Sequence, residues 1–136
     1  MRWLVDGMNV IGSRPDGWWR DRAGAARRLA AGLRQLAADR GEAITVALEG
    51  TVVPDLPAGE HDGLTVLYAR RRGPNAADDR IVEAVAADPD GASLSVVTSD
   101  RDLARRVRDL GATVVSPSVL LRQLGPTPLG RDEGAG

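Results

Sequence analysis

The chain has 136 residues, enough for one domain with a single hydrophobic core. It contains no cysteine and no lysine, so disulfides, thiolate metal sites, Schiff bases and P-loop lysines are excluded. The formal net charge of -1 does not suggest a nucleic-acid-binding protein, although each of the 18 arginines can bind phosphate through paired hydrogen bonds. No apolar run is long enough to cross a bilayer. Asp6 interrupts the apolar segment at the start of the sequence, whereas an export signal has an uninterrupted apolar core. We therefore expect a cytoplasmic protein.

Short β-branched, apolar segments alternate with alanine- and arginine-rich segments of helical periodicity. This alternation predicts one α/β domain over residues 1–124 with a mainly parallel sheet. The predicted elements in chain order are a strand at 3–6, a loop to about 19, a helix at 21–39, a strand at 43–49, a loop at 51–63, a strand at 64–69, a helix at 75–87, a turn at 88–91, a strand at 94–98, a helix at 99–110, a strand at 113–115 and a helix at 117–124. Residues 125–136 lack apolar content and are predicted to be a disordered tail.

Acidic residues follow three of the predicted strands. Asp6 closes the first strand, and Asp78 lies in the first turn of the helix after the third. Asp100 follows the fourth strand by two residues, and Asp102 lies in the next helical turn. In a parallel sheet with right-handed crossovers, all these positions lie at the carboxyl edge, where ligands bind. The four side chains converge if the first and fourth strands are neighbours.

Converging carboxylates repel one another unless a cation neutralises them. Carboxylate oxygens with no histidine or cysteine partner favour Mg²⁺ or Mn²⁺ over zinc. Because Mg²⁺ retains several waters and binds phosphate readily, this set favours phosphodiester hydrolysis. One metal would activate the attacking water, and a second, if present, would stabilise the leaving oxygen.

Three of the four acids also have a purely structural interpretation. Ser99-x-x-Asp102 and Asn75-x-x-Asp78 match the capping-box pattern, and any acid in a first helical turn suits the helix dipole. Asp6 has no capping role and therefore most favours a metal site. An aspartyl-nucleophile phosphohydrolase is a competing enzyme class, but it usually requires a second Asp where this chain has Met8.

Three segments, in order, resemble motifs of the NYN domain, a branch of the PIN-like nuclease group, and are most similar to its YacP-like members. They are LVDGMNVIG at 4–12, GPNAADDRI at 73–81 and VVTSDRDL at 96–103. The resemblance covers about residues 2–124. It implies a PIN-like three-layer α/β sandwich, with a five-stranded sheet of order 3-2-1-4-5 and helices on both faces. It also implies divalent-metal nuclease activity with RNA as the usual substrate.

The resemblance also assigns roles by motif position. Asp6, Asp78 and Asp100 would be metal ligands, and Asp102 would bind metal directly or through water. Asn9 would hold the first loop or touch a phosphate. The remaining candidates are Thr98 and Ser99 for substrate binding, and Asp79 and Glu49 as secondary acids. Glu49 departs from the family pattern, because relatives often carry Asp there.

Arginines and tryptophans near these motifs are candidates for handling RNA. Arg70, Arg71 and Arg72 precede the second acidic segment and could bind phosphates, or could simply pair with neighbouring acids. Trp18 and Trp19 could stack on unpaired bases, although Trp19 could equally fix the start of the next helix.

The sequence thus predicts a Mg²⁺- or Mn²⁺-dependent endoribonuclease acting on single-stranded or exposed RNA. A partner such as the ribosome could present the substrate. The alternative is a non-catalytic RNA-binding or partner-recruiting domain of the same fold. The oligomeric state does not follow from the sequence.

Overall fold

The computed structural model describes residues 2–14 and 17–124. Within these residues, six strands form one sheet in the order β3-β4-β2-β1-β5-β6. The strands are β1 (Arg2–Asp6), β2 (Ile44–Leu48), β3 (Gly59–His61), β4 (Leu64–Tyr68), β5 (Leu94–Val97) and β6 (Thr113–Val115). Five of them run parallel, and only β3 is antiparallel to its neighbour, β4.

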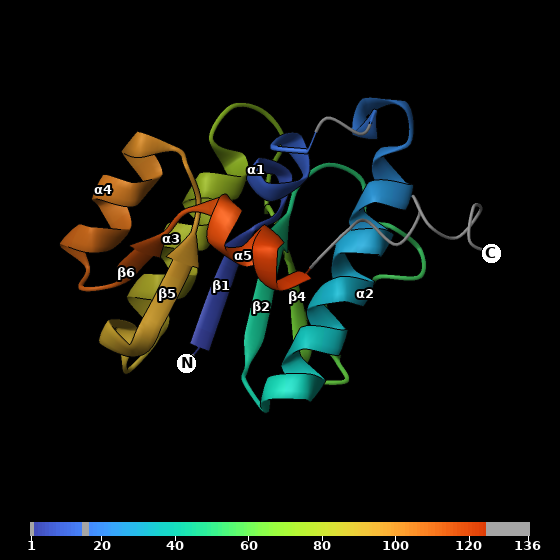
Figure 1. Cartoon of the computed structure of the whole chain (residues 1–136). Coiled ribbons are helices and arrows are strands. Elements are labelled where there is room, and N and C mark those ends of the chain that lie inside the picture. The colour runs from blue at the N-terminus through green and yellow to red at the C-terminus, as the bar shows by residue number, and fades with distance from the viewer. Residues whose placement is uncertain (1, 15–16, 125–136) are drawn as a thin grey trace.

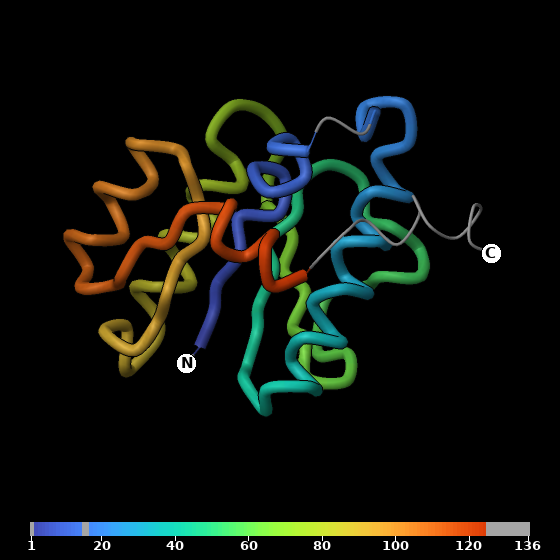
Figure 2. The backbone as a smooth tube through the Cα atoms, in the orientation of Figure 1, coloured from blue at the N-terminus to red at the C-terminus, as the bar shows by residue number. Residues whose placement is uncertain are grey.

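Helices cover both faces of the sheet (Figure 1). The helices are α1 (Gly7–Gly12), α2 (Arg22–Arg40), α3 (Ala76–Ala87), α4 (Arg101–Asp109) and α5 (Pro117–Leu124), with short 3-10 turns η1 (Trp18–Arg20) and η2 (Gly91–Ser93). One apolar core joins α1, α2 and α5 to the sheet, and a second joins α3 and α4 to its opposite face. Figure 2 follows the backbone through these layers, with the loops that leave the parallel strands at the top. The predicted three-layer α/β fold is confirmed.

The core is built from the apolar positions that give the sequence its periodicity. On α2, Leu29, Leu33 and Leu36 are buried against one face of the sheet. On α3, Ile81 and Val85 are buried against the other. Burial of such side chains stabilises the fold by roughly 1.5–3 kcal/mol each. The helices are therefore fixed relative to the strand ends that carry the candidate site.

The five predicted strands pair in the predicted order, because β4-β2-β1-β5-β6 corresponds to 3-2-1-4-5. The loop prediction at 51–63 was wrong at its end, where β3 forms a hairpin with β4. Its residues are exposed or partly exposed and lack the alternation of a half-buried strand, so the periodicity missed it. The hairpin turn has positive φ at Asp62 and Gly63. An Asp-Gly pair between strands is typical of such turns and was the available signal.

The predicted loop from residue 7 to about 19 was also wrong, because it contains α1 and η1. α1 has only six residues, two of them glycine, so neither its length nor its helix propensity predicts a helix. It forms because Val10 and Ile11 are buried in the core shared with α2. The predicted tail at 125–136 lies outside the described residues. Among the residues described, every helix is too short or too polar to span a membrane.

Candidate active site

Asp6 ends the central strand β1 with its side chain buried. Because Val5 pairs with Val97, the register puts Asp6 level with Thr98, and the Thr98 hydroxyl donates a 2.9 Å hydrogen bond to Asp6 Oδ2. Burial raises the pKa of Asp6 to about 6, even though the hydrogen bond from Thr98 opposes the shift. The charges of Asp78 and Asp100 raise this pKa further. No basic side chain in the described part of the chain forms an ion pair with Asp6, so its charge is uncompensated.

Asp78 lies on α3, which approaches from the opposite face of the sheet to α1. Burial also raises the pKa of Asp78, and Asp100 adds to the shift, while the nearby guanidinium of Arg106 lowers it. The charge of Asp102 contributes in the same direction as Asp100. Asp78 is therefore electrostatically coupled to the other three predicted acids. We call Asp6, Asp78 and Asp100 the acidic edge.

Asp100 is held by backbone contacts at the start of α4. Its Oδ1 accepts a 3.0 Å hydrogen bond from the Leu103 amide, which makes Asp100 the cap of this helix. Its own amide donates to the Thr98 hydroxyl at 3.1 Å. The capping-box interpretation was therefore wrong in register for Ser99 and Asp102. It was also wrong for Asp78, because Asn75 adopts a left-handed backbone conformation and makes no side-chain cap.

Asn9, in α1, joins this helix to the loop after β5. Its Oδ1 accepts hydrogen bonds from the amide of Ser99 at 2.9 Å and from its hydroxyl at 3.0 Å. The backbone amide of Asn9 also stabilises the charged form of Asp6 and lowers its pKa. Asn9 thus holds the segment after β1, which is α1 and not the predicted loop, and its contact with a phosphate stays a prediction. Thr98 is buried, and its hydroxyl contacts both Asp6 and Asp100.

Two predicted acids lie outside the acidic edge and have arginine partners. Asp79 accepts from Arg71 at 2.6 Å and from Arg106 at 3.1 Å, and these hydrogen bonds lower its pKa. Asp102 is exposed and pairs with Arg105 one turn along α4. Sequence reasoning did not identify Arg106, because its contact with α3 depends on how the two helices pack.

Glu49 follows β2 and faces solvent on the other side of β1 from Asp100. It borders a cavity together with Met8 and Tyr68, and no residue of the acidic edge lines this cavity. The secondary acids Glu49 and Asp79 therefore have surroundings different from those of the acidic edge.

The donor chemistry of the acidic edge fits a hard divalent ion. Asp6 and Asp78 offer carboxylate oxygens, and burial together with neighbouring carboxylates raises the pKa of both groups. Within 2–14 and 17–124, no group of three or more Asp, Glu, His or Cys side chains is placed so that it could hold a metal ion. Mg²⁺ is commonly bound through one or two carboxylates, with waters and substrate phosphate completing its coordination. An open set of coupled acids meets that requirement.

The three arginines after β4, Arg70, Arg71 and Arg72, differ in whether they pair with an acid. Arg70 pairs with Glu83 at 2.7 Å, and Arg71 pairs with Asp79. Arg72 forms no ion pair with any residue the structure describes. Two of the three arginines thus pair with neighbouring acids, and Arg72 alone leaves its guanidinium without an acidic partner.

The three-layer sandwich, with acids at the carboxyl edge of its sheet, defines an α/β domain with a candidate site at that edge. The family model described as the YacP-like NYN domain matches residues 3–129, and the chain belongs to this family. This family relationship indicates a nuclease-type, RNA-related function.

Two solved structures share the fold. The crystal structure of Rae1 (YacP) from Bacillus subtilis aligns with a TM-score of 0.71 and 21% identity, covering 99% of this chain and 79% of that one. A tryptophan-to-leucine mutant of the same protein aligns with a TM-score of 0.72 and 22% identity, covering 90% and 74%. No curated protein matches the chain.

Proposed function

We propose that this protein is a cytoplasmic endoribonuclease that hydrolyses RNA phosphodiester bonds with Mg²⁺ or Mn²⁺. The observation that carries the proposal is Asp6: a buried carboxylate at the end of the central strand, with no basic partner among the described residues and two further acids raising its pKa. A protein retains such a costly arrangement mainly where a ligand supplies the missing positive charge.

Each residue of the acidic edge has a definite task in this proposal. Asp6 and Asp78 would hold the ion, and Asp100 would bind it directly or orient its waters. A bound divalent ion would lower the pKa of the attacking water and offset charge on the phosphate. Thr98 fixes the orientation of the Asp6 carboxylate, and Asn9 fixes Ser99 beside it. Asp102, in the first turn of α4, would act through water.

Metal-dependent cleavage of single-stranded RNA tests the proposal. The purified protein should cleave labelled RNA with Mn²⁺ or Mg²⁺ and lose this activity in EDTA. Asp100→Asn should reduce cleavage by at least about 100-fold, the effect expected when a charged group in an active site is neutralised. Asp109→Asn, at the other end of α4, is the matched control and should leave cleavage unchanged. Cleavage that persists in EDTA would contradict the proposal.

The second candidate is a non-catalytic RNA-binding domain. The observation that favours it is the open arrangement of the acids, since the described residues contain no closed ligand cluster. This function predicts metal-independent RNA binding without cleavage, in the same assay. The ribosome as a partner that presents the substrate stays a prediction.

A further inference from the structure

A cavity of about 390 Å³ opens over the ends of β2 and β4, at the same carboxyl edge of the sheet as Asp6. Its walls come from α1, α2 and the loop after β2 and include Met8, Leu48, Val53 and Tyr68. These side chains give an aromatic ring, a thioether and aliphatic groups. The volume lies in the range of about 300–1,000 Å³ typical of small-ligand sites.

The cavity and Asp6 lie at the ends of neighbouring strands. Asp6 pairs with Ala47, so the wall residue Leu48 lies on the strand next to β1, about 5 Å away across the sheet. A Cβ atom at Gly7 would lie 2.7 Å from Ala47 O and 2.7 Å from Leu48 Cδ2. The absence of that atom lets α1 rest directly on β2. Met8 then lines the cavity two residues after Asp6.

Internal hydrogen bonds shape the outer wall. The Tyr68 hydroxyl donates to Leu56 O at 2.8 Å and accepts from the Val53 amide at 3.1 Å. These bonds tie the loop after β2 to the end of β4 while the Tyr68 ring lines the cavity. The cavity is therefore built by the fold itself.

Two arginines, Arg22 and Arg72, line the same cavity and form no ion pair within the part of the chain that is described. The Arg22 guanidinium carbon lies 5.3 Å from the centre of the Trp18 ring, which orients it. Glu49 adds one hydrogen-bond acceptor at the opening. Apolar walls with cations at the opening are complementary to a nucleotide, whose base is flat and whose phosphates are negative.

We propose that this cavity binds the base of one unpaired nucleotide next to the scissile phosphate, with Arg22 and Arg72 contacting the phosphates of the same strand. This inference rests on the proposed function, because the acidic edge would cut the phosphate that lies on it. The cavity would select which nucleotide lies beside that phosphate, and it requires the base of this nucleotide to be unstacked.

The test uses a variant silenced in cleavage, Asp78→Asn, and fluorescence anisotropy with labelled single-stranded RNA in EDTA. Adding Thr51→Trp, at a residue lining the cavity, should fill it and weaken binding by about tenfold, because loss of one stacked base costs at least this much. Val52→Trp is the matched control: this neighbouring residue is 49% exposed and does not line the cavity. Equal affinities of the two variants would overturn the proposal.

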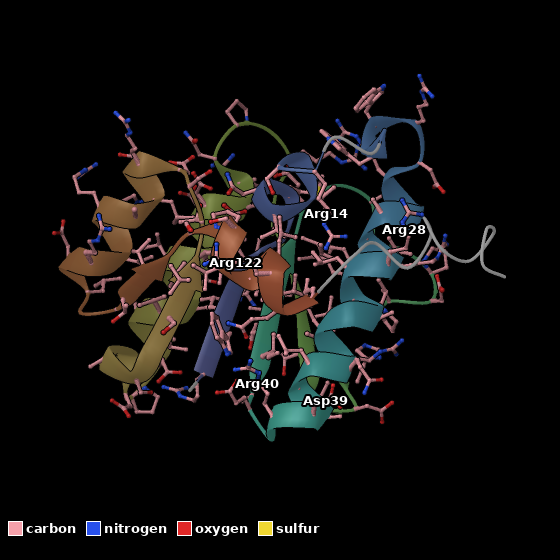
Figure 3. The ribbon with its side chains drawn as sticks, in the orientation of Figure 1. Arg14, Arg28, Asp39, Arg40 and Arg122 are labelled. Carbon is pink, nitrogen blue, oxygen red and sulfur yellow. The ribbon has the colours of Figure 1, made fainter. Side chains whose placement is uncertain are left out.

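A second measurement does not depend on the added tryptophan. RNAs that lack one base at successive positions should bind about tenfold more weakly when the missing base is the one next to the cleavage site. Arg72→Ala should weaken binding and lower its salt dependence. Arg40→Ala, at the far end of α2 from Arg22 (Figure 3), is the control for loss of positive charge and should change affinity by less than about twofold.

The outcomes separate this inference from the proposed function. Metal-dependent cleavage with no dependence on the missing base overturns the base site alone. A clear dependence on one base without any cleavage overturns the nuclease function and leaves the binding site supported. Thermal unfolding of each variant shows whether a loss of RNA affinity is due to misfolding. If a variant is misfolded, the series of base-deleted RNAs with the Asp78→Asn protein tests the base site instead.

Discussion

Asp78 and Asp79 are adjacent on α3, yet their surroundings shift their pKa values in opposite directions. Asp78 turns toward the acidic edge, where burial and other carboxylates raise its pKa. Asp79 turns toward Arg71 and Arg106, whose hydrogen bonds lower its pKa. Successive residues on a helix point about 100° apart, so one step along the chain separates the two environments. The comparison shows which acids already have a cation supplied by the protein and which lack one.

The largest expected effect is on cleavage. In the Mn²⁺-dependent assay, Asp78→Asn should lower kcat/KM by at least about 100-fold, because it removes one of the two carboxylates proposed to hold the metal. Asp79→Asn should lower it by less than about tenfold, since two arginines already occupy that carboxylate. Similar losses of kcat/KM in the two variants would show that Asp78 and Asp79 do not have different roles in cleavage.

The next effect is on the stability of the metal-free protein. A pKa raised from 3.8 to about 6 corresponds to about 3 kcal/mol of unfavourable free energy when Asp6 is ionised. Because the folded state holds its proton more tightly, the contribution of Asp6 to stability is fully present below pH 3.8 and is lost as pH rises through about 6. Asp6→Asn should therefore raise the unfolding free energy at pH 7 by on the order of 2–3 kcal/mol.

Urea unfolding in EDTA at pH 5 and pH 7 measures this change. The gain from Asp6→Asn should be smaller at pH 5, and added Mn²⁺ should stabilise the original protein more than the variant. A variant that is less stable than the original protein at pH 7 would show that Asp6 is not destabilised by its surroundings.

A smaller effect is expected where α1 rests on β2. Gly7→Ala would force the helix away from the Ala47 carbonyl, at a cost of about 1–3 kcal/mol, and would shift Met8 and Asn9. Gly12→Ala, in the same helix, meets only Trp18 at 3.9 Å and should be neutral or slightly stabilising. Thermal unfolding of the pair tests the contact, and equal melting temperatures would show that α1 moves freely.

The smallest effect concerns the hydrogen bond to Asp6. Thr98→Val keeps the volume of the side chain and removes the hydroxyl that contacts Asp6 and the Asp100 amide. We expect a loss of about 1 kcal/mol in unfolding free energy and a further rise in the pKa of Asp6. Thr98→Ser should retain most of both. Infrared or NMR titration of the Asp6 carboxyl group measures its pKa. An unchanged pKa would show that Thr98 does not influence Asp6.

The sequence predicted the fold well because each main element carries its own signal. The parallel strands are short β-branched runs, and α2 and α3 have apolar residues at helical spacing. α1 and β3 were missed because their formation depends on contacts with other elements: Val10 is buried in the core shared with α2, and β3 pairs with β4. The hydrophobic periodicity of each segment alone does not predict either contact.

For the candidate site, the sequence predicted which acids lie near one another but not which side chains each of them contacts. Motif order placed Asp6, Asp78 and Asp100 near one sheet edge, and their electrostatic coupling agrees with that position. The difference between Asp78 and Asp79 could not be predicted, because it depends on Arg106 reaching across from α4. In the same way, only the packed structure separates Arg72 from its two paired neighbours.

The hydrogen bonds that shape the acidic edge span most of the chain. Thr98 and Asp6 are 92 residues apart, and Asn9 and Ser99 are 90 apart. During translation, the first strand therefore leaves the exit tunnel long before its partners have been made. A nascent chain that ends before Thr98 and Ser99 lacks both hydrogen bonds, so the acidic edge takes its final form only after β5 and the loop that follows it have been synthesised.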